Sequence, residues 1–453
     1  MKNKKAGVVS LGCDKNRVDT ECLLAFLTEG GFTICQTPED CQILIVNTCA
    51  FLNEARAEAI DTVLEFAELK KAGLEKLIVT GCLPQKWAKE CREGLPEVDA
   101  FLGINDYPRI CGIIQGLYRG DPPPAILPPE ASFIKNERVL TTPWHYAYLK
   151  VADGCDNRCT YCLIPSIRGR YRSKPLPELR KEAENLAAGG VRELILVAQD
   201  TTRYGRDLGL GLTDLLQSLC GVDGIDQIRL LYCYPELVTQ ELLSFMAGQP
   251  KMAHYLDVPL QHAADPVLRR MGRRTDAAAQ EKVMEDIRRF LPDAAVRTTF
   301  MVGFPGESEE DFEVLLDFLR RHRLQNAGFF AYSREEGTPS FGMSGQIPEA
   351  VKAERLARAQ EVQAGILADI LKGRVGQILP VRCDGPDFAE GAFFGRSYAE
   401  APDIDPRIRL NWDRPIESGG LYRAEITGTD GRDMEANILE EMGEVPAPGK
   451  EVL

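Results

Sequence analysis

Apolar runs alternate with amphipathic stretches over the first part of the chain. Runs of consecutive apolar residues predict buried strands at 6–12, 42–48 and 76–81. Helical periodicity predicts helices at 18–28, 53–71 and 85–94. Strands buried on both faces need not alternate polar and apolar residues, and their alternation with helices is typical of a parallel sheet. We therefore expect a parallel α/β domain of the Rossmann or flavodoxin-like type over 5–120.

A second series of the same kind follows. Apolar runs predict six more strands, at 145–153, 192–200, 227–235, 254–262, 296–304 and 327–334. Helical stretches between them include 176–188, 277–290 and 309–321. A right-handed series of strand–helix units closes into a full or partial TIM-like β/α barrel. We expect this domain over 141–371, with a long helix at 347–371 leading the chain out of it.

The remaining segments differ in character. The prolines of GDPPPAILPPE (120–130) prevent helix and sheet, so this segment is predicted to be a linker. After residue 373, short strand-like runs such as RIRLNW alternate with Gly, Pro and Asp. This pattern predicts a small antiparallel β-barrel over 373–442.

Composition narrows the function classes. The net charge is −14 and the pI is near 5.1, which disfavours non-specific nucleic-acid binding. The N-terminal apolar stretch is too short for a signal peptide, and no apolar run approaches the roughly 18 residues of a membrane span. We therefore expect a cytoplasmic protein. A reducing compartment disfavours disulfides, so metal binding or catalysis is the better explanation for those of the fourteen cysteines that have motif spacing.

Three cysteines share one loop. Cys155, Cys159 and Cys162 lie in GCDNRCTYC, directly after the first predicted barrel strand. Barrels of this type keep their chemistry at that end of the strands. Three thiolates can bind three irons of a cubane cluster and leave the fourth iron open. A zinc knuckle is the alternative, but zinc requires a fourth ligand, and the only nearby histidine, His145, begins the predicted strand at the end away from the loop.

This loop resembles the radical S-adenosylmethionine (SAM) superfamily. The resemblance implies a catalytic 4Fe–4S cluster on Cys155, Cys159 and Cys162 whose open iron chelates SAM, and from which an electron cleaves SAM to a 5′-deoxyadenosyl radical. TTFMVGFPGE (298–307) is similar to a SAM-contacting strand end of the family, which makes Gly303 a candidate cofactor contact. Tyr161 is predicted either to pack against the adenine or simply to pack within its own loop.

Three other cysteines occupy equivalent positions. Cys13, Cys49 and Cys82 each follow an apolar run, in VVSLGC, LIVNTC and LIVTGC. Parallel strands bring their carboxyl ends to one edge of the sheet, where open α/β sheets bind ligands. We therefore predict that the three thiols converge in a metal site. The alternative is three unrelated buried cysteines.

The surrounding segments make the resemblance more specific. GCDKNRVDTE (12–21), NTCAFLNEAR (47–56) and TGCLPQ (80–85) are similar to the N-terminal domain of the radical SAM methylthiotransferases, and the all-β tail resembles their TRAM domain. The resemblance implies a second 4Fe–4S cluster on Cys13, Cys49 and Cys82 that carries the inserted sulfur. One SAM molecule would supply the methyl group and another the radical.

Within this family the chain resembles the RimO branch, through SLGCDKNRVD, AYLKVADGCDNRCTYCLIPSIRGRYRSKP and LVAQDTTRYG. The resemblance implies methylthiolation of the β-carbon of an aspartate in ribosomal protein S-twelve, with a sulfur source and an electron donor such as flavodoxin or ferredoxin. The segment from residue 374 to the end contains nine Lys and Arg and sixteen Asp and Glu, which gives it a net charge of −7. Such a tail suits a basic protein better than RNA. The alternatives are a MiaB-type enzyme acting on tRNA and a non-catalytic iron–sulfur or zinc protein.

Other conspicuous residues have more ordinary interpretations. Asn16 and Asp19 are predicted to cap a helix rather than to shape a cluster loop. The basic run with Arg168, Arg170 and Arg172 is predicted to be a solvated face rather than a substrate contact. The eight cysteines without shared spacing are expected to be structural: Cys22, Cys35, Cys41, Cys91, Cys111, Cys220, Cys233 and Cys383.

Overall fold

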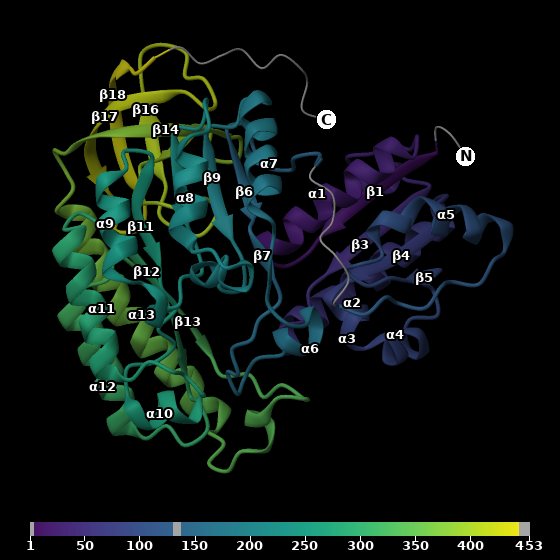
Figure 1. The fold of residues 1–453 in the computed structure, drawn as a ribbon, viewed down its shortest axis with the longest axis horizontal. Coiled ribbons are helices and arrows are strands. Elements are labelled where there is room, and N and C mark those ends of the chain that lie inside the picture. The colour runs from purple at the N-terminus through teal and green to yellow at the C-terminus, as the bar shows by residue number, and fades with distance from the viewer. Residues whose placement is uncertain (1–3, 130–136, 444–453) are drawn as a thin grey trace.

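The computed structural model describes residues 4–129 and 137–443, which form three main sheets and one two-stranded ribbon (Figure 1). The N-terminal sheet is parallel and has the order β2-β1-β3-β4-β5. Its strands are β1 (Lys5–Ser10), β2 (Thr33–Ile34), β3 (Ile43–Thr48), β4 (Lys76–Gly81) and β5 (Ala100–Phe101). This order is that of flavodoxin-like folds, and the strand sequence reverses between β1 and β3. The predicted α/β fold is confirmed.

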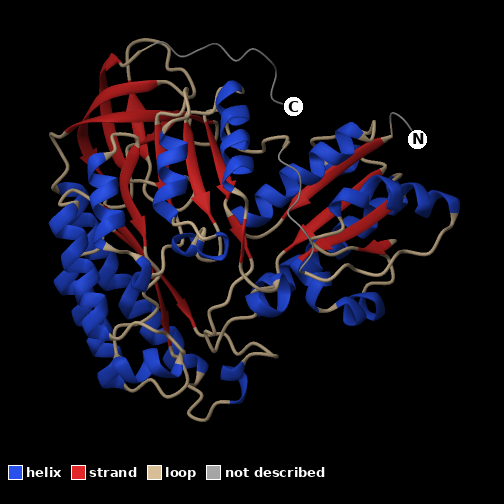
Figure 2. Ribbon diagram, viewed as in Figure 1, coloured by secondary structure: helices blue, strands red, loops and turns tan. Residues whose placement is uncertain are grey.

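Helices cover both faces of this sheet (Figure 2). They are α1 (Asp14–Glu29), α2 (Asn53–Ala67), α3 (Cys82–Lys86), α4 (Ala88–Gly94) and α5 (Ile110–Arg119). The helix predicted at 53–71 begins as α2 and continues after Ala67 as a 3₁₀ helix, η2 (Glu68–Ala72). The stretch predicted at 85–94 is two helices, because the backbone leaves helical geometry at Trp87.

The central sheet is parallel, with the order β13-β12-β11-β10-β9-β6. Its strands are β6 (Tyr146–Lys150), β9 (Glu193–Val197), β10 (Gln227–Leu230), β11 (Met252–Asp257), β12 (Ala295–Val302) and β13 (Asn326–Ala331). Because β13 and β6 do not pair, the sheet is a partial barrel, as expected. The outer helices are α7 (Leu176–Ala188), α8 (Leu212–Cys220), α9 (Gln240–Gly248), α10 (Asp265–Arg270), α11 (Ala277–Phe290) and α12 (Glu309–His322). The long helix α13 (Glu349–Lys372) follows β13.

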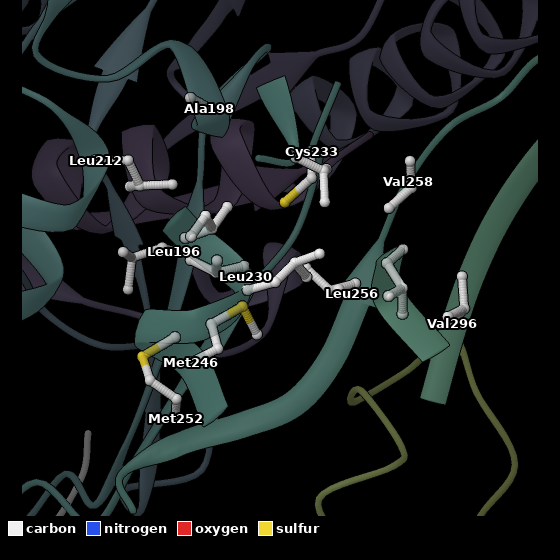
Figure 3. Packing of buried hydrophobic residues seen from close by; sticks show 14 of the residues in the cluster. Leu196, Ala198, Leu212, Leu230, Cys233, Met246, Met252, Leu256, Val258 and Val296 are labelled. Carbon is white, nitrogen blue, oxygen red and sulfur yellow. The ribbon is translucent and has the colours of Figure 1, made fainter. Parts of the chain in front are cut away.

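The outward face of the partial barrel packs against these helices. Leu196, Leu230 and Leu256 come from neighbouring strands and meet Met246 of α9 (Figure 3). All four side chains are completely buried. Full burial of such a side chain contributes about 1.5–3 kcal/mol, which explains why these strands are nearly continuous apolar runs.

The inward face is closed by other parts of the chain. Tyr146 and Tyr148 of β6 pack in one cluster with Val18 of α1 and with Ala399 and Ala401, which precede β16. The N-terminal unit and the C-terminal segment therefore contribute directly to the core of the partial barrel. None of the helices in the described part of the chain is long and apolar enough to cross a membrane.

The C-terminal strands form a closed barrel in the order β14-β15-β16-β18-β17. They are β14 (Ile378–Asp387), β15 (Ala392–Arg396), β16 (Ile408–Asn411), β17 (Leu421–Thr429) and β18 (Met434–Glu441). The pairs are antiparallel except β16 with β18, which is parallel. The small β-barrel predicted from the sequence is thus confirmed, with one parallel pair in an otherwise antiparallel barrel.

Two small elements connect the first barrel strand to its first outer helix. A ribbon pairs β7 (Ala152–Asp153) with β8 (Arg172–Ser173), and α6 (Ile164–Arg168) lies between its strands in sequence. Helix α6 packs against α3 of the N-terminal unit (Figure 1). The loop that follows the first barrel strand is therefore held against the N-terminal sheet.

Gly81 is required by the close packing of β4 on β3. Its φ is +98° and its ψ is −151°, a conformation that is essentially restricted to glycine. A Cβ atom on Gly81 would lie 2.4 Å from Asn47 Oδ1 and 2.5 Å from the carbonyl oxygen of Thr48. No side chain larger than hydrogen fits here without moving the end of β3.

Gly81→Ala is therefore expected to destabilise the N-terminal unit by at least the 1–3 kcal/mol or so of the strained backbone. Hydrogen–deuterium exchange of peptides from β3 and β4 should become faster. The matched control is Gly73→Ala, because Gly73 has a φ of +120° but open space around its Cβ position. Equal exchange in the two variants would show that the steric argument is wrong.

Candidate functional site

The three N-terminal cysteines lie at the carboxyl ends of three adjacent strands. Cys13 follows β1 and is the N-cap of α1, Cys49 follows β3, and Cys82 is the first residue of α3 after β4. A Cβ atom on Gly12 would lie 2.7 Å from Cys49 Cβ, which shows how closely the first two loops approach. The thiols of Cys13 and Cys49 both act electrostatically on that of Cys82. The structure therefore brings the three cysteines to one edge of the N-terminal sheet, and their binding of a metal stays a prediction.

The surroundings of these thiols supply hydrogen-bond donors. Burial raises the pKa of Cys82 to about 12, and the charge of Arg168 opposes this shift. Burial also raises the pKa of Cys49, while the backbone N–H groups of Phe51 and Ala50 donate hydrogen bonds that lower it. Cys82 is buried, Cys49 is half-buried and Cys13 is exposed. The donors beside Cys49 and Cys82 fit anionic thiolates that ligate a metal cluster.

The second set of cysteines lies on the loop between β7 and α6. Cys155 Sγ accepts a hydrogen bond from the N–H of Asn157 at 3.4 Å, and Cys162 Sγ accepts one from the N–H of Ile164 at 3.4 Å. Cys159 Sγ lies 3.8 Å from Nη1 of Arg273. Burial raises the pKa of Cys155 to about 11. Each sulfur thus faces a donor, which fits thiolate ligands.

Neither set has the geometry of a single-ion site. Among the described residues, no three His, Cys, Asp or Glu side chains converge closely enough to hold one metal ion. The three protein ligands of a cubane bind three different irons and do not meet at one point. A tetrahedral zinc site, the alternative considered from the sequence, requires four ligands, and none of the described side chains completes such a set beside either group of cysteines.

The two candidate SAM contacts lie near the end of the barrel that carries the loop with Cys155, Cys159 and Cys162. Tyr161 is half-buried and packs edge-to-face on Phe304, with ring centroids 6.3 Å apart. Gly303 follows β12 with a φ of +73°. Its N–H donates to Glu307 Oε2 at 2.8 Å, and a Cβ atom there would meet Lys352 Cγ at 2.4 Å. Gly303 thus packs against α13, and its amide already has a partner.

A buried charge network joins the two cysteine sets. Asp19 of α1 and Asp153 of β7 both accept hydrogen bonds from Arg168 Nη1, at 2.9 and 3.2 Å. Lys150 of β6 also donates to both carboxylates. Burial of Asp153 is more than offset by Lys150 and Arg168, which hold the pKa of that carboxyl well below its usual range.

Two sequence predictions are wrong at this network. Arg168 is only 2% exposed and does not belong to a solvated face, whereas Arg170 is exposed. Asn16 does not cap α1, because Cys13 is the N-cap. Asn16 Nδ2 instead donates to the carbonyl oxygens of Leu11 and Thr48, both at 3.1 Å, and so holds the loops of Cys13 and Cys49 together. Asp19 likewise forms ion pairs in place of a cap.

The structure adds site residues that no sequence pattern indicated. Tyr232 and Gln261 follow β10 and β11 with φ values of +60° and +72°, which is rare for residues other than glycine. Tyr232 donates to Asp14 Oδ2 at 3.0 Å, and its ring lies under the ammonium of Lys15 at 3.2 Å. The Oε1 atom of Gln261 is buried without a hydrogen-bond partner among the described residues. Strained backbone and unpaired polar atoms of this kind gather at ligand sites.

Comparisons with known proteins agree with this architecture. The model of the radical SAM superfamily matches residues 149–319, that of uncharacterized protein family UPF0004 matches residues 5–103, and that of the TRAM domain matches residues 375–439. The solved structure of TsrM, a radical SAM methyltransferase from Kitasatospora setae with cobalamin and a [4Fe-4S] cluster bound, superposes with a TM-score of 0.56. At 14% identity over 75% of this chain and 77% of that one, this likeness concerns the fold alone.

Full-length relatives are more informative. The ribosomal protein uS12 methylthiotransferase RimO of Desulforudis audaxviator is 46% identical, over 96% of this chain and 97% of the relative. The protein of that name from Lachnoclostridium phytofermentans is 44% identical, over 92% of this chain and 96% of the relative. Both matches span all three units of the fold. The chain therefore belongs to the RimO family of radical SAM methylthiotransferases.

Proposed function

We propose that this enzyme inserts a methylthio group at the β-carbon of an aspartate in ribosomal protein uS12. The observation that carries the proposal is the pair of cysteine sets, one at the carboxyl edge of each parallel sheet, joined by the Asp19–Arg168–Asp153 network. A single set would suffice for SAM cleavage. A second set beside it supports a reaction that also delivers sulfur.

Membership of the radical SAM family implies SAM and a 4Fe–4S cluster as cofactors. We assign that cluster to Cys155, Cys159 and Cys162, and a second 4Fe–4S cluster to Cys13, Cys49 and Cys82. When bound, these groups would supply the 5′-deoxyadenosyl radical and the sulfur to be transferred. A radical suits this step because the C–H bonds of the aspartate β-carbon, next to a carboxylate anion, are too weakly acidic for a side-chain base alone to remove the proton.

The protein's own groups hold and orient the reactants. The N–H groups of Asn157 and Ile164 and the guanidinium of Arg273 fix the three sulfurs of the radical-generating loop. The Oε1 atoms of Gln199 and Gln261, at strand ends on the same edge, have no hydrogen-bond partner within residues 4–129 and 137–443, so they could accept hydrogen bonds from SAM or from the substrate backbone.

Two further SAM contacts belong to the proposal. Tyr161 would place its ring against the adenine while its other edge packs on Phe304. Gly303 would act through its left-handed backbone, which turns the chain after β12, and not through its N–H group, because Glu307 already accepts that bond. Each of these assignments concerns how SAM is oriented and not how it is cleaved.

The partners follow from the family and from charge. The segment from residue 374 onward carries a net charge of −7, although the aspartates of the cavity beside α1, Asp384, Asp387 and Asp403, are each paired with an arginine. Such a segment favours a basic ribosomal protein through complementary charge and does not favour stable nucleic-acid binding. We further propose a flavodoxin- or ferredoxin-type electron donor, a separate sulfur source, a cytoplasmic location, and domain limits at 5–120, 141–371 and 373–442.

The first prediction concerns iron content. Anaerobically reconstituted protein should contain about eight irons per chain if both sites hold 4Fe–4S clusters. Replacing Cys155, Cys159 and Cys162 with Ala should leave about half of that iron and abolish SAM cleavage. A triple Ala variant of the half-buried Cys35, Cys111 and Cys220 is the matched control and should retain all of it. Stoichiometric zinc without iron would contradict the enzyme assignment.

The second prediction separates the roles of the two sets. A variant with Ala at Cys13, Cys49 and Cys82 should still cleave SAM to 5′-deoxyadenosine, because the radical-generating loop is intact. It should yield no methylthiolated product in the same reaction mixture, as measured by mass spectrometry. If this variant formed the product at the wild-type level, the second set would have no part in sulfur transfer.

The third prediction concerns the substrate. Isolated uS12 and tRNA are each incubated with the enzyme under reducing anaerobic conditions with SAM and sulfide. We expect the protein to gain about 46 Da, the mass of replacing H by SCH₃, at a single Asp that peptide mapping identifies. Modification of tRNA alone would show that the MiaB-type activity is the correct one.

A further inference from the structure

Arg168 connects the radical-generating loop to the N-terminal cysteines. It is the last residue of α6, six positions after Cys162, yet its side chain is buried in contact with the N-terminal unit. Nη2 lies 3.6 Å from Cys82 Sγ and donates to Asn16 Oδ1 at 2.6 Å. Arg168 thus links the segment that follows one set directly to a ligand of the other.

The two ends of this guanidinium have different partners. Nη1 faces the carboxylates of Asp19 and Asp153. Lys150 pairs with the same two carboxylates, so two negative and two positive charges balance in the buried network. Nη2 makes no contact with a carboxylate among the described residues and faces only the thiol sulfur and an amide oxygen. An ion pair that merely holds the two units together would require Nη1 alone. The orientation of Nη2 therefore calls for a separate explanation.

Asn16 extends the contact of Nη2 to the other two ligands. Its Oδ1 atom accepts from Arg168, while its Nδ2 atom donates to the carbonyl oxygens of Leu11 and Thr48. Leu11 lies two residues before Cys13, and Thr48 directly precedes Cys49. One guanidinium nitrogen thus contacts the third ligand directly and positions the loops of the first two through a single amide.

From this geometry we propose that Arg168 is a positioning residue for the cluster on Cys13, Cys49 and Cys82, an inference that rests on the proposed function because it requires that second cluster. Nη2 donates an N–H···S hydrogen bond to the Cys82 thiolate. Hydrogen bonds to ligand sulfurs and nearby positive charge both favour the reduced, more negative cluster and so raise its reduction potential. Arg168 thereby sets the potential of this cluster from the loop that holds the other one.

The test measures this potential in the full-length chain with Ala at Cys155, Cys159 and Cys162, so that only the N-terminal cluster contributes. Arg168→Lys keeps the positive charge but loses the planar pair of N–H donors. Arg168→Met removes the charge and the donors. Redox titration followed by electron paramagnetic resonance should give the highest midpoint potential for the background protein with Arg168 intact. The potential should be lower with Arg168→Lys and lowest with Arg168→Met. Arg170→Met, two residues away and exposed, is the control and should match the wild type.

The outcomes distinguish the inference from the function on which it rests. If the background protein binds no iron at all, the second cluster itself is refuted. If it binds about four irons per chain and both Arg168 variants keep the wild-type potential, the inference is overturned while the proposed function stands. If the Arg168→Met variant loses its iron, the Arg168→Lys variant is measured instead. A lowered midpoint potential in that variant supports the positioning role, and an unchanged potential overturns it.

Discussion

The parallel register of β1, β3 and β4 is the constraint on which the site depends. Ser10 pairs with Asn47, and Asn47 pairs with Thr80. Cys49 and Cys82 each lie two residues beyond this aligned row, and Cys13 lies three beyond it. A slip of one residue in any pair would turn the strand's side chains to the opposite face and separate the thiols. The complete burial of β3 keeps the register unique, because a slip would require the whole apolar run to repack.

Buried charges fix the second relation, that between the N-terminal sheet and the partial barrel. Asp19, Arg168, Asp153 and Lys150 neutralise one another at the junction of the two units. Removing one member would leave an uncompensated buried charge, which costs about 3–5 kcal/mol. Such a network adds little net stability compared with an apolar contact. It does link the two units directly, because Asp19 belongs to α1 while its partners Lys150 and Arg168 belong to β6 and α6.

The sequence revealed those features that depend on local pattern. Continuous apolar runs predicted the strands of both parallel sheets, and the position of a cysteine after each run placed Cys13, Cys49 and Cys82 at one edge of the N-terminal sheet. The C-x-x-x-C-x-x-C spacing singled out the loop between β7 and α6, which follows the first barrel strand. Strands of two residues, such as β2 and β5, are too short to show any periodicity and were not predicted.

Features that depend on tertiary contacts could not be predicted in this way. Arg168 occurs in a basic run whose composition is that of a solvated surface, and only the docking of α6 on α3 buries it. Asn16 has the residue type of a helix cap, but Cys13 takes that position and frees Asn16 to join two loops. The left-handed backbone of Tyr232 and Gln261 has no signature in residue type. The roles of Arg168 and Asn16 depend on Asp19 and Thr48, partners more than thirty residues away in sequence. Those of Tyr232 and Gln261 depend on backbone conformation.

The two cysteine sets differ in how far they depend on the fold. Cys155, Cys159 and Cys162 share one loop, and hydrogen bonds from Asn157 and Ile164 within that loop orient two of the sulfurs. Cys13, Cys49 and Cys82 come from three strand–helix units and converge only when the whole N-terminal sheet has formed. Metal binding to such a dispersed set is coupled to folding of the entire unit, because the unfolded chain has no preformed site. Arg168, on the helix that follows the compact set, is therefore well placed to align the dispersed one, since its own position is already fixed by the loop beside it.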